Sequence, residues 1–415
     1  MKILHIVESY YPAHGGMPEV VRQLSERIAG FGHEVTVATS KNCSRDSLLI
    51  NGVKIKEFDV SGNYVKGYSG EIENYKNFIA GSQFDILVNF AAQQWSADLA
   101  FDLLPSLKCK KVFVPTGFSG LKNQEFGPYF EKMKTWMRYY DMNVFLSNNY
   151  QDIDFARKHG IDKIELIPNG ADEREFNSSK IIDIRKKLNI GKNDFLIFHV
   201  GSHTGFKGHR EAIEIFKRSK IKNAVLLIVG NSCNFKNMRL ISKLKKAFYW
   251  LIDKYYYDGC YDNCLKKEFF FNNSISGLRS GKKILVRQLT REDTIAAYKE
   301  ADLFLFPSNI ECSPIVLFEC MASKTPFLAT TAGNSAEIAE WSKSGVILPT
   351  ITDETQAGYV KADIEKSSEM LENLYTDSEL RNEMAENGYK IWKEKFTWEI
   401  IARNYEKLYL KLLES

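Results

Sequence analysis

Two glutamates, Glu311 and Glu319, stand eight residues apart on either side of a Ser-Pro pair and an apolar run. A strand-like apolar stretch ends in a Pro-Ser break just before them, and a helix-like stretch follows. The pair therefore brackets a strand-loop-helix junction, which is where open α/β sheets bind ligands. Carboxylates at such a junction can accept hydrogen bonds from a ligand's hydroxyl groups, although glutamates at this spacing are also common on protein surfaces.

The same junction predicts an anion-binding site. Ser313 is a favourable cap for a helix, and Pro314 is preorganised for its first position. We therefore expect Glu311 in the loop ahead of the helix and Glu319 about one and a half turns inside it. The backbone N–H groups after Pro314 point out of the helix start, where a phosphate binds favourably. An anion-binding site between two carboxylates suits a ligand with phosphates and several hydroxyls, and a nucleotide sugar fits that description.

The elements that must hold this junction follow a pattern of two doubly wound units. Short apolar or β-branched runs alternate with helix-like stretches, and the alternation restarts after a polar connector at about residues 173–193. Strands are expected at residues 2–7, 33–39, 84–90, 110–116, 143–147 and 164–170, and then at 194–201, 224–230, 283–288, 302–308 and 325–331. This order predicts an α/β fold with two parallel sheets, each with helices on both faces. From about Glu379 the chain is expected to be helical, with a break near Phe396.

The bulk composition is that of an ordinary globular protein. The chain has 415 residues, enough for two domains, with 44% hydrophobic and 26% charged residues. Its net charge of +4 gives no reason to expect a nucleic acid as partner. The N-terminus enters a strand without a signal-peptide pattern, and no apolar run approaches the length of a membrane span. We therefore expect a cytoplasmic protein, soluble or held peripherally on the inner face of the cell membrane.

The seven cysteines show no framework spacing, and an odd number is typical of reduced thiols rather than of a disulfide scaffold. Cys260 and Cys264 lie four residues apart, which is one helical turn. Because no partner pair of His or Cys is recognisable elsewhere in the sequence, we predict no metal site.

One segment, at about residues 232–280, does not fit the alternation. It is too long for one crossover helix, and residues 236–254 carry six Lys or Arg against a single acid, Asp253. A basic helix rich in aromatic residues can lie at a membrane interface against anionic lipid, and residues 236–257 are the candidate for such a contact. Alternatively, the segment is a solvated helix whose apolar stripe packs on its own domain.

Residues 311–338 resemble part of a known family. Glu311 and Glu319, followed by the Gly333-Asn334 turn, resemble the glutamate-seven-glutamate signature of the family 4 retaining glycosyltransferases, which have the GT-B fold. The resemblance implies two Rossmann-like domains that face each other across a cleft. It also implies that Glu311 contacts the hydroxyls of the donor sugar and Glu319 the nucleotide ribose.

Three other stretches resemble the family in the same order and spacing. Gly15 and Gly16 match its opening glycine loop, residues 167–176 match the segment that closes the first domain, and Lys207 matches a lysine that grips the donor's phosphates. The resemblance implies catalytic roles for Glu311 and Lys207. It implies a donor site formed by Gly15, Gly16, Ser202, Lys207, Arg287, Glu311, Ser313, Pro314, Ile315, Val316 and Glu319.

The resemblance also implies a division of labour between the domains. Residues 1–175 would bind the acceptor, joined by a C-terminal helix at about 395–415 that crosses back to them. Residues 190–385 would bind the nucleotide-sugar donor and contain the basic aromatic insertion.

Two departures from the family pattern bear on the site. Ser202 stands where a basic residue usually follows the glycine of the strand end, so a positive contact is missing unless Arg210 or Arg287 substitutes. Thr116, next to Gly117 on the acceptor side, stands where many members carry a histidine. Both changes would remove a side-chain contact to the donor.

The chemistry implied by the resemblance is a metal-independent hexosyl transfer with retention of configuration and no cofactor. The leaving phosphate assists deprotonation of the acceptor, so the protein's task is to position the reactants and stabilise the departing diphosphate. We expect a UDP- or GDP-sugar as donor, with base contacts around residues 287–289. The basic insertion favours a glycan acceptor on polyprenyl diphosphate, as in the assembly of O-antigen, capsule or exopolysaccharide.

Other functions fit the sequence less well. A nicotinamide dehydrogenase needs G-x-G-x-x-G after the first strand and an acid closing the second, and neither is present. A sugar-nucleotide epimerase should not need the glutamate pattern. A non-catalytic nucleotide-sugar-binding partner of a glycosyltransferase complex stays an alternative, because Ser202 and Thr116 replace the usual residues.

Overall fold

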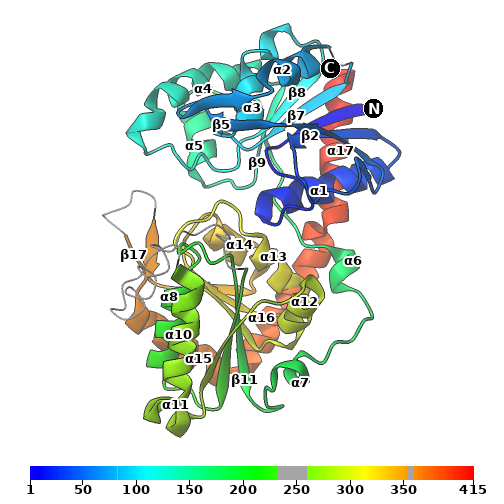
Figure 1. The fold of residues 1–415 in the computed structure, drawn as a ribbon. Coiled ribbons are helices and arrows are strands. Elements are labelled where there is room, and N and C mark those ends of the chain that lie inside the picture. Colours follow the sequence, from blue (N-terminus) through cyan, green and yellow to red (C-terminus); the bar gives the residue numbers. More distant parts are fainter. Residues whose placement is uncertain (82, 232–258, 353–358) are drawn as a thin grey trace. The chain divides into compact units, whose positions relative to one another are not determined.

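The computed structural model describes residues 1–81, 83–231, 259–352 and 359–415. The chain forms two compact units (Figure 1): unit 1 comprises Met1–Asp172, Cys312–Ile315 and Lys395–Ser415, and unit 2 comprises Glu173–Glu311 and Val316–Glu394. The candidate membrane segment at residues 236–257 lies outside the described residues. No helix in the described ranges has both the length and the apolar character needed to cross a bilayer.

Unit 1 is built on an eight-stranded sheet with the order β10-β9-β8-β7-β1-β2-β4-β3. Its neighbouring strands pair in parallel, except for β3 with β4. The strands are β1 (Lys2–Ile6), β2 (Glu34–Ser40), β3 (Leu49–Ile50), β4 (Val53–Phe58), β7 (Ile86–Phe90), β8 (Lys110–Val114), β9 (Met142–Phe145) and β10 (Ile164–Leu166). The six predicted strands are confirmed. The pattern does not predict β3, β4 or the separate hairpin of β5 (Val60–Asn63) and β6 (Gly67–Gly70).

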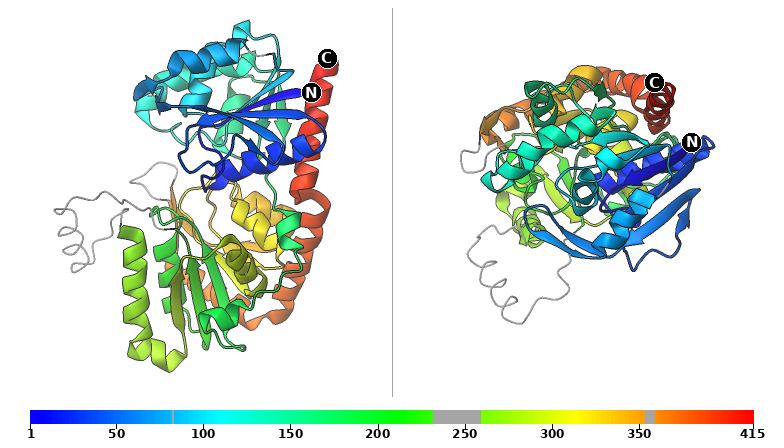
Figure 2. Two further views of the ribbon diagram at one scale, coloured as in Figure 1. Left: turned by 45° about the vertical axis from the view of Figure 1, so that its right-hand side comes forward. Right: turned by 90° about the horizontal axis from the view of Figure 1, so that it is seen from above.

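Helices cover both faces of this sheet (Figures 1 and 2). Because successive strand residues point to opposite faces, Ile3 packs in the cluster of α1 and α17, whereas Leu4 packs in the cluster of α2 and α3. The helices are α1 (Gly16–Gly30), α2 (Ile72–Gly81), α3 (Trp95–Phe101), α4 (Gly127–Tyr139), α5 (Gln151–Lys158) and α17 (Trp398–Glu414).

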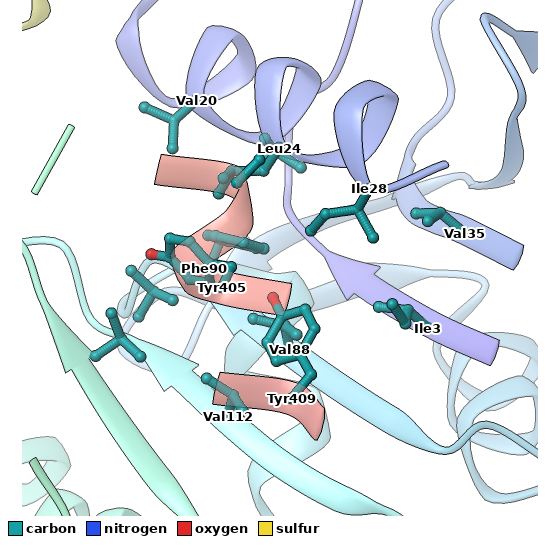
Figure 3. Close-up of a cluster of buried hydrophobic side chains, with 14 of the residues drawn as sticks. Ile3, Val20, Leu24, Ile28, Val35, Val88, Phe90, Val112, Tyr405 and Tyr409 are labelled. Atoms are coloured by element: carbon teal, nitrogen blue, oxygen red, sulfur yellow. The ribbon is translucent and has the colours of Figure 1, made fainter. Parts of the chain in front are cut away.

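The chain returns to unit 1 through α17. The predicted break in the C-terminal helix is confirmed by a π-helical turn at Trp392–Phe396, after which α17 begins. Figure 3 shows Tyr405 and Tyr409 of α17 among Val88 of the sheet and Leu24 of α1, and all four side chains are buried. Burying a large apolar side chain contributes about 1.5–3 kcal/mol, so α17 is part of the core of unit 1.

Unit 2 contains a parallel six-stranded sheet with the order β13-β12-β11-β14-β15-β16. Its strands are β11 (Phe195–Val200), β12 (Ala224–Val229), β13 (Lys283–Arg287), β14 (Leu303–Phe306), β15 (Phe327–Ala329) and β16 (Gly345–Ile347). The five predicted strands are confirmed. The order reverses between β11 and β14, and such a switch point is where ligands bind in doubly wound sheets.

Helices pack on both faces of the second sheet as well (Figure 2). They are α8 (His209–Arg218), α10 (Cys260–Asn272), α11 (Ile275–Ser280), α12 (Arg291–Glu300), α13 (Ile315–Ala322), α14 (Ser335–Ser342), α15 (Ile364–Thr376) and α16 (Ser378–Ile391). Two short helices, α6 (Glu173–Phe176) and α7 (Ile184–Leu188), lie in the polar connector, and β17 (Thr350–Thr352) pairs antiparallel with β18 (Val360–Ala362).

Candidate active site

Glu311 and Lys207 meet in unit 2 at the carboxyl ends of β14 and β11. Lys207 Nζ donates to Glu311 Oε1 at 2.7 Å, and Ser308 Oγ donates to the same oxygen at 2.7 Å. The Glu311 side chain is 9% exposed and that of Lys207 is 30% exposed. A carboxylate held by two donors keeps a fixed orientation while the lysine stays open to a ligand.

The close approach of the two loops depends on a glycine. Gly208 adopts a left-handed φ of 70° at the start of α8, and a Cβ there would overlap the carbonyl oxygen of Pro307. The loops are also joined by the backbone, because Asn309 N donates to Phe206 O at 2.9 Å. Only glycine fits this conformation and contact without strain, and this is what brings Lys207 to Glu311.

Glu319 lies on α13 as predicted and is buried. Its Oε1 lies 2.6 Å from Nη2 of Arg291, and the same nitrogen lies 2.6 Å from Glu175 Oε2. Neither Arg291 nor Glu175 is predicted as a site residue from the sequence. Arg291 follows Thr290, whose hydroxyl accepts from Asp293 N at the start of α12, but no residue spacing links that helix start to Glu319.

The start of α13 differs from the prediction in one respect. The helix begins at Ile315 after Pro314, but Ser313 does not cap it with its side chain: Ser313 Oγ is buried and has no hydrogen-bond partner among the described residues. Instead, the Ser313 carbonyl accepts from Asn169 Nδ2 at 3.0 Å within unit 1. A buried hydroxyl without a protein partner leaves its hydrogen-bonding capacity open to a water molecule or a ligand.

Three further residues of the predicted donor site lie in unit 2: Val316, Ser202 and Arg287. Val316 is half-buried in the first turn of α13, and Ser202 is exposed in the loop after β11. Arg287 ends β13, and its Nη1 donates to both carboxylate oxygens of Glu268 at 2.9 and 3.1 Å. Since Arg287 is already paired, it is a weaker substitute for the basic residue that Ser202 replaces.

In unit 1, the glycine loop opens α1 directly after β1. Gly15 has a φ of 149° and precedes the helix, and Gly16 has no atom within 4 Å of where its Cβ would stand. Both residues are exposed. The first backbone N–H groups of a 15-residue helix are thus accessible at the point where the strand order of unit 1 reverses, between β1 and β7.

The predicted acceptor residues follow β8 in a strained backbone. Thr116 has a φ of 58°, which is rare for a β-branched residue, and Gly117 has a φ of 105°. Gly117 N donates to Asp152 Oδ2 at 2.8 Å, and burial raises the pKa of Asp152 to about 6. A Cβ on Gly117 would meet Tyr150, so this glycine is required by packing.

The neighbouring strand β7 ends in a similar way. Ala91 and Gln93 have φ values of 61° and 63°, and Gln93 N donates to the Tyr129 hydroxyl at 2.8 Å. That hydroxyl donates to Asp98 Oδ1 at 2.8 Å, and burial raises the pKa of Asp98 to about 7. Left-handed non-glycine residues cost free energy and cluster at functional sites, so this edge of the unit 1 sheet is a candidate binding edge.

The segment that closes the first domain has structural contacts. Asp172 accepts from Arg27 Nη2 at 2.8 Å and from Gln23 Nε2 at 2.9 Å, both on α1. Gly170 lies against the Phe396 carbonyl with no room for a Cβ. Asp172 and Gly170 therefore fix the end of unit 1 to α1 and α17, whereas Asn169 and Glu175 of the same stretch contact Ser313 and Arg291.

A possible metal-binding group lies elsewhere in unit 2. His203, Cys260 and Cys264 each place a ligand atom within 4.8 Å of the others, and all three are buried. No metal site is predicted from the sequence, because no partner pair for Cys260 and Cys264 is recognisable in it; His203 lies 57 residues before Cys260.

Two protein families match the sequence. Residues 14–175 match the family described as "Glycosyltransferase Family 4", and residues 275–391 match the family described as "Glycosyl transferases group 1". An uncharacterized glycosyltransferase of Methanocaldococcus jannaschii is 21% identical over 100% of this chain and 99% of its own length. The capsular polysaccharide biosynthesis glycosyltransferase CapM of Staphylococcus aureus is 24% identical over 66% of this chain and 58% of its own.

Solved structures match the fold of the whole chain. Sucrose-phosphate synthase from Thermosynechococcus elongatus superposes with a TM-score of 0.72 at 18% identity, covering 100% of this chain and 99% of the other. HepE of Anabaena in complex with UDP and glucose gives a TM-score of 0.70 at 15% identity, covering 98% and 99%. At these identities the matches establish the architecture.

Proposed function

Because the chain belongs to the family 4 glycosyltransferases and has their GT-B fold, we propose that it transfers a sugar, with retention, from a nucleotide-sugar donor to a glycan acceptor. The observation that carries this proposal is the Lys207–Glu311 pair at the switch point of the unit 2 sheet, next to the start of α13. A UDP- or GDP-sugar is the donor proposed here. HepE is described in complex with UDP and glucose, which supports that class.

Each site residue has a role that follows from its chemistry. Glu311 accepts hydrogen bonds from the sugar's hydroxyls, and its orientation is fixed by Ser308. Lys207 and the first N–H groups of α13 stabilise the diphosphate as negative charge develops on it. Glu319 binds the ribose through its carboxylate, whose position is set by Arg291.

Transfer at this site needs no further protein base. The leaving phosphate takes the proton of the acceptor hydroxyl on the same face of the sugar, which gives retention. Holding the two reactants in this geometry can lower the barrier by about 7–11 kcal/mol. We propose that the reaction is independent of metal and cofactor, because Lys207 and the helix N–H groups would stabilise the diphosphate in place of a metal ion.

We propose an acceptor on a polyprenyl diphosphate in surface-polysaccharide assembly. The similarity to CapM supports a polysaccharide pathway. Helices α10 and α11 present large apolar side chains that are each more than half exposed, namely Phe269, Phe270, Ile275 and Leu278. These helices directly follow the basic segment at residues 236–257, and apolar side chains beside basic ones bind anionic membranes.

Vesicle flotation tests the membrane contact. Vesicles with anionic lipid should retain the wild type and lose a Phe269→Ser/Phe270→Ser variant, whereas Leu380→Ser on α16 should bind like the wild type. Equal flotation of all three proteins, or no flotation of the wild type, would contradict the membrane contact. Neither result would bear on the proposed donor site.

A non-catalytic nucleotide-sugar-binding partner is the second candidate, favoured by the engagement of Arg287 with Glu268 and by the exposed Ser202. Release of free nucleotide from UDP- and GDP-sugars, with and without a lipid-linked glycan, separates the two. Catalysis predicts release that depends on Lys207 and Glu311. Binding without release under any acceptor condition favours the partner.

A further inference from the structure

Four buried side chains of unit 2 gather from three separate places in the chain. His203 lies in the loop after β11, His209 is the first residue of α8, and Cys260 and Cys264 lie one turn apart on α10. The loop between the two histidines carries Lys207. A set of two imidazoles and two thiols is the ligand chemistry of a structural zinc site.

The spacing of these groups suits a single ion. His203 Nδ1 lies 3.4 Å from Cys260 Sγ, and one ligand atom from each of His203, Cys260 and Cys264 lies within 4.8 Å of the others. With bonds of about 2.3 Å to sulfur and about 2.0–2.1 Å to nitrogen, a tetrahedral zinc ion places such ligand atoms roughly 3.5 Å apart. His209 is not one of this group, and its ring would have to turn out of its stack on that of His203 to bring a nitrogen to the same ion.

His209 has the hydrogen bonding of a metal ligand. Its Nε2 lies 3.1 Å from the Gly201 carbonyl oxygen, which can only accept, so Nε2 carries the proton and Nδ1 keeps its lone pair. Nδ1 of His209 is buried without a hydrogen-bond partner among the described residues. Its ring stacks on that of His203 at 4.1 Å. Metal-binding histidines almost always donate their other ring N–H to a carbonyl or carboxylate in this way.

We propose that His203, His209, Cys260 and Cys264 bind one Zn²⁺ in a closed tetrahedral site. Two thiolates balance the charge of the ion, so the buried centre is neutral, and the soft N₂S₂ set selects zinc over Mg²⁺ or Ca²⁺. The ion would join α10 to the loop that carries Lys207. With four protein ligands it has no open position, so its role is structural and separate from the transfer reaction.

Metal content of the wild-type protein tests this directly. Tag-free protein produced with zinc and then desalted should hold one zinc ion per chain. Replacement by Co²⁺ should give visible bands of a tetrahedral centre and near-ultraviolet thiolate-to-cobalt bands. A wild type with no stoichiometric zinc and no such bands at excess Co²⁺ would overturn the proposal, and this result does not depend on any variant folding.

Two cysteine variants identify the ligands. Cys260→Ser and Cys264→Ser should each weaken Co²⁺ binding by more than the roughly 10–100-fold that loss of an outer-shell partner costs, and each should lose part of the thiolate band. Cys109→Ser, a half-buried thiol of unit 1, is the matched control and should bind like the wild type. Unchanged binding in both site variants would place the ion elsewhere and overturn the assignment.

Discussion

The Glu311 carboxylate accepts a hydrogen bond from the Lys207 ammonium at 2.7 Å, although the residues are 104 positions apart. Strands β11 and β14 are neighbours, so the loops after them emerge side by side at the carboxyl edge of the unit 2 sheet. A carboxylate and an ammonium group held together at a switch point can bind two parts of one donor: the carboxylate accepts hydrogen bonds from the sugar's hydroxyls, and the ammonium binds the phosphates.

Replacing Glu311 by Gln should remove activity without unfolding the protein. The amide keeps the size of the side chain but loses the negative charge that orients Lys207 and binds the sugar's hydroxyls. We expect kcat to fall at least about 100-fold, on the scale of losing one positioned polar group at a reacting centre. Steady-state nucleotide release measures this, with Glu340→Gln on the exposed face of α14 as the control. A wild-type kcat in the Glu311→Gln variant would show that Glu311 has no catalytic role.

Gly208→Ala should separate the two loops. The added Cβ overlaps the Pro307 carbonyl and the left-handed φ disfavours alanine, so we expect a loss of about 1–3 kcal/mol in unfolding free energy and a clear fall in kcat/KM. Gly30→Ala is the control, since no atom lies within 4 Å of its Cβ position in α1. If Gly208→Ala kept both stability and activity, the loop contact would not matter.

Asp172→Ala should cost stability and leave nucleotide affinity unchanged. Removing the carboxylate leaves Arg27 buried, at 2% exposure, with its ion pair broken, and breaking a buried pair costs about 3–5 kcal/mol. Denaturant unfolding measures the loss, and calorimetric nucleotide titration below the unfolding temperature measures the affinity. A selective loss of affinity instead would assign Asp172 to the binding site.

The stability of unit 1 should depend on pH through Asp98. Burial raises its pKa from 3.8 to about 7, so the folded state binds its proton more tightly than the unfolded state does. This contribution is complete below pH 3.8 and is lost as the pH rises through about 7. Relative to Asp98→Asn, the wild type should therefore lose stability between pH 4 and 8, by up to about 4 kcal/mol. Urea unfolding of both proteins at pH 5 and pH 8 checks this, and a constant difference would contradict it.

The sequence predicts the sheets and the loop-helix junction because these follow from local pattern. The alternation of apolar runs, the Pro314 break and the position of Glu319 in α13 are all within reach of periodicity and turn chemistry. The division into two doubly wound units follows from the restart of the alternation, and the resemblance adds Lys207.

Contacts that depend on how distant elements pack could not be predicted from the sequence. Arg291 meets Glu319 and Glu175 only because α12 and α13 pack in one unit, and His203 meets Cys260 only because α10 lies against α8. The predicted cap at Ser313 fails for a related reason: its carbonyl is held by Asn169, and its hydroxyl finds no partner among the described residues. Local propensity does not contain these distant contacts.

The most direct test of donor binding at the start of α13 is thermal unfolding with UDP, GDP, ADP and their sugar conjugates. A ligand at about 100 times its dissociation constant adds roughly 2.7 kcal/mol, which is a shift of several degrees. We predict that one base class raises the Tm of the wild type and of Glu340→Ala, and that Glu319→Ala loses this ligand-induced shift. No shift of the wild type by any nucleotide, or the same shift in Glu319→Ala, would contradict the account.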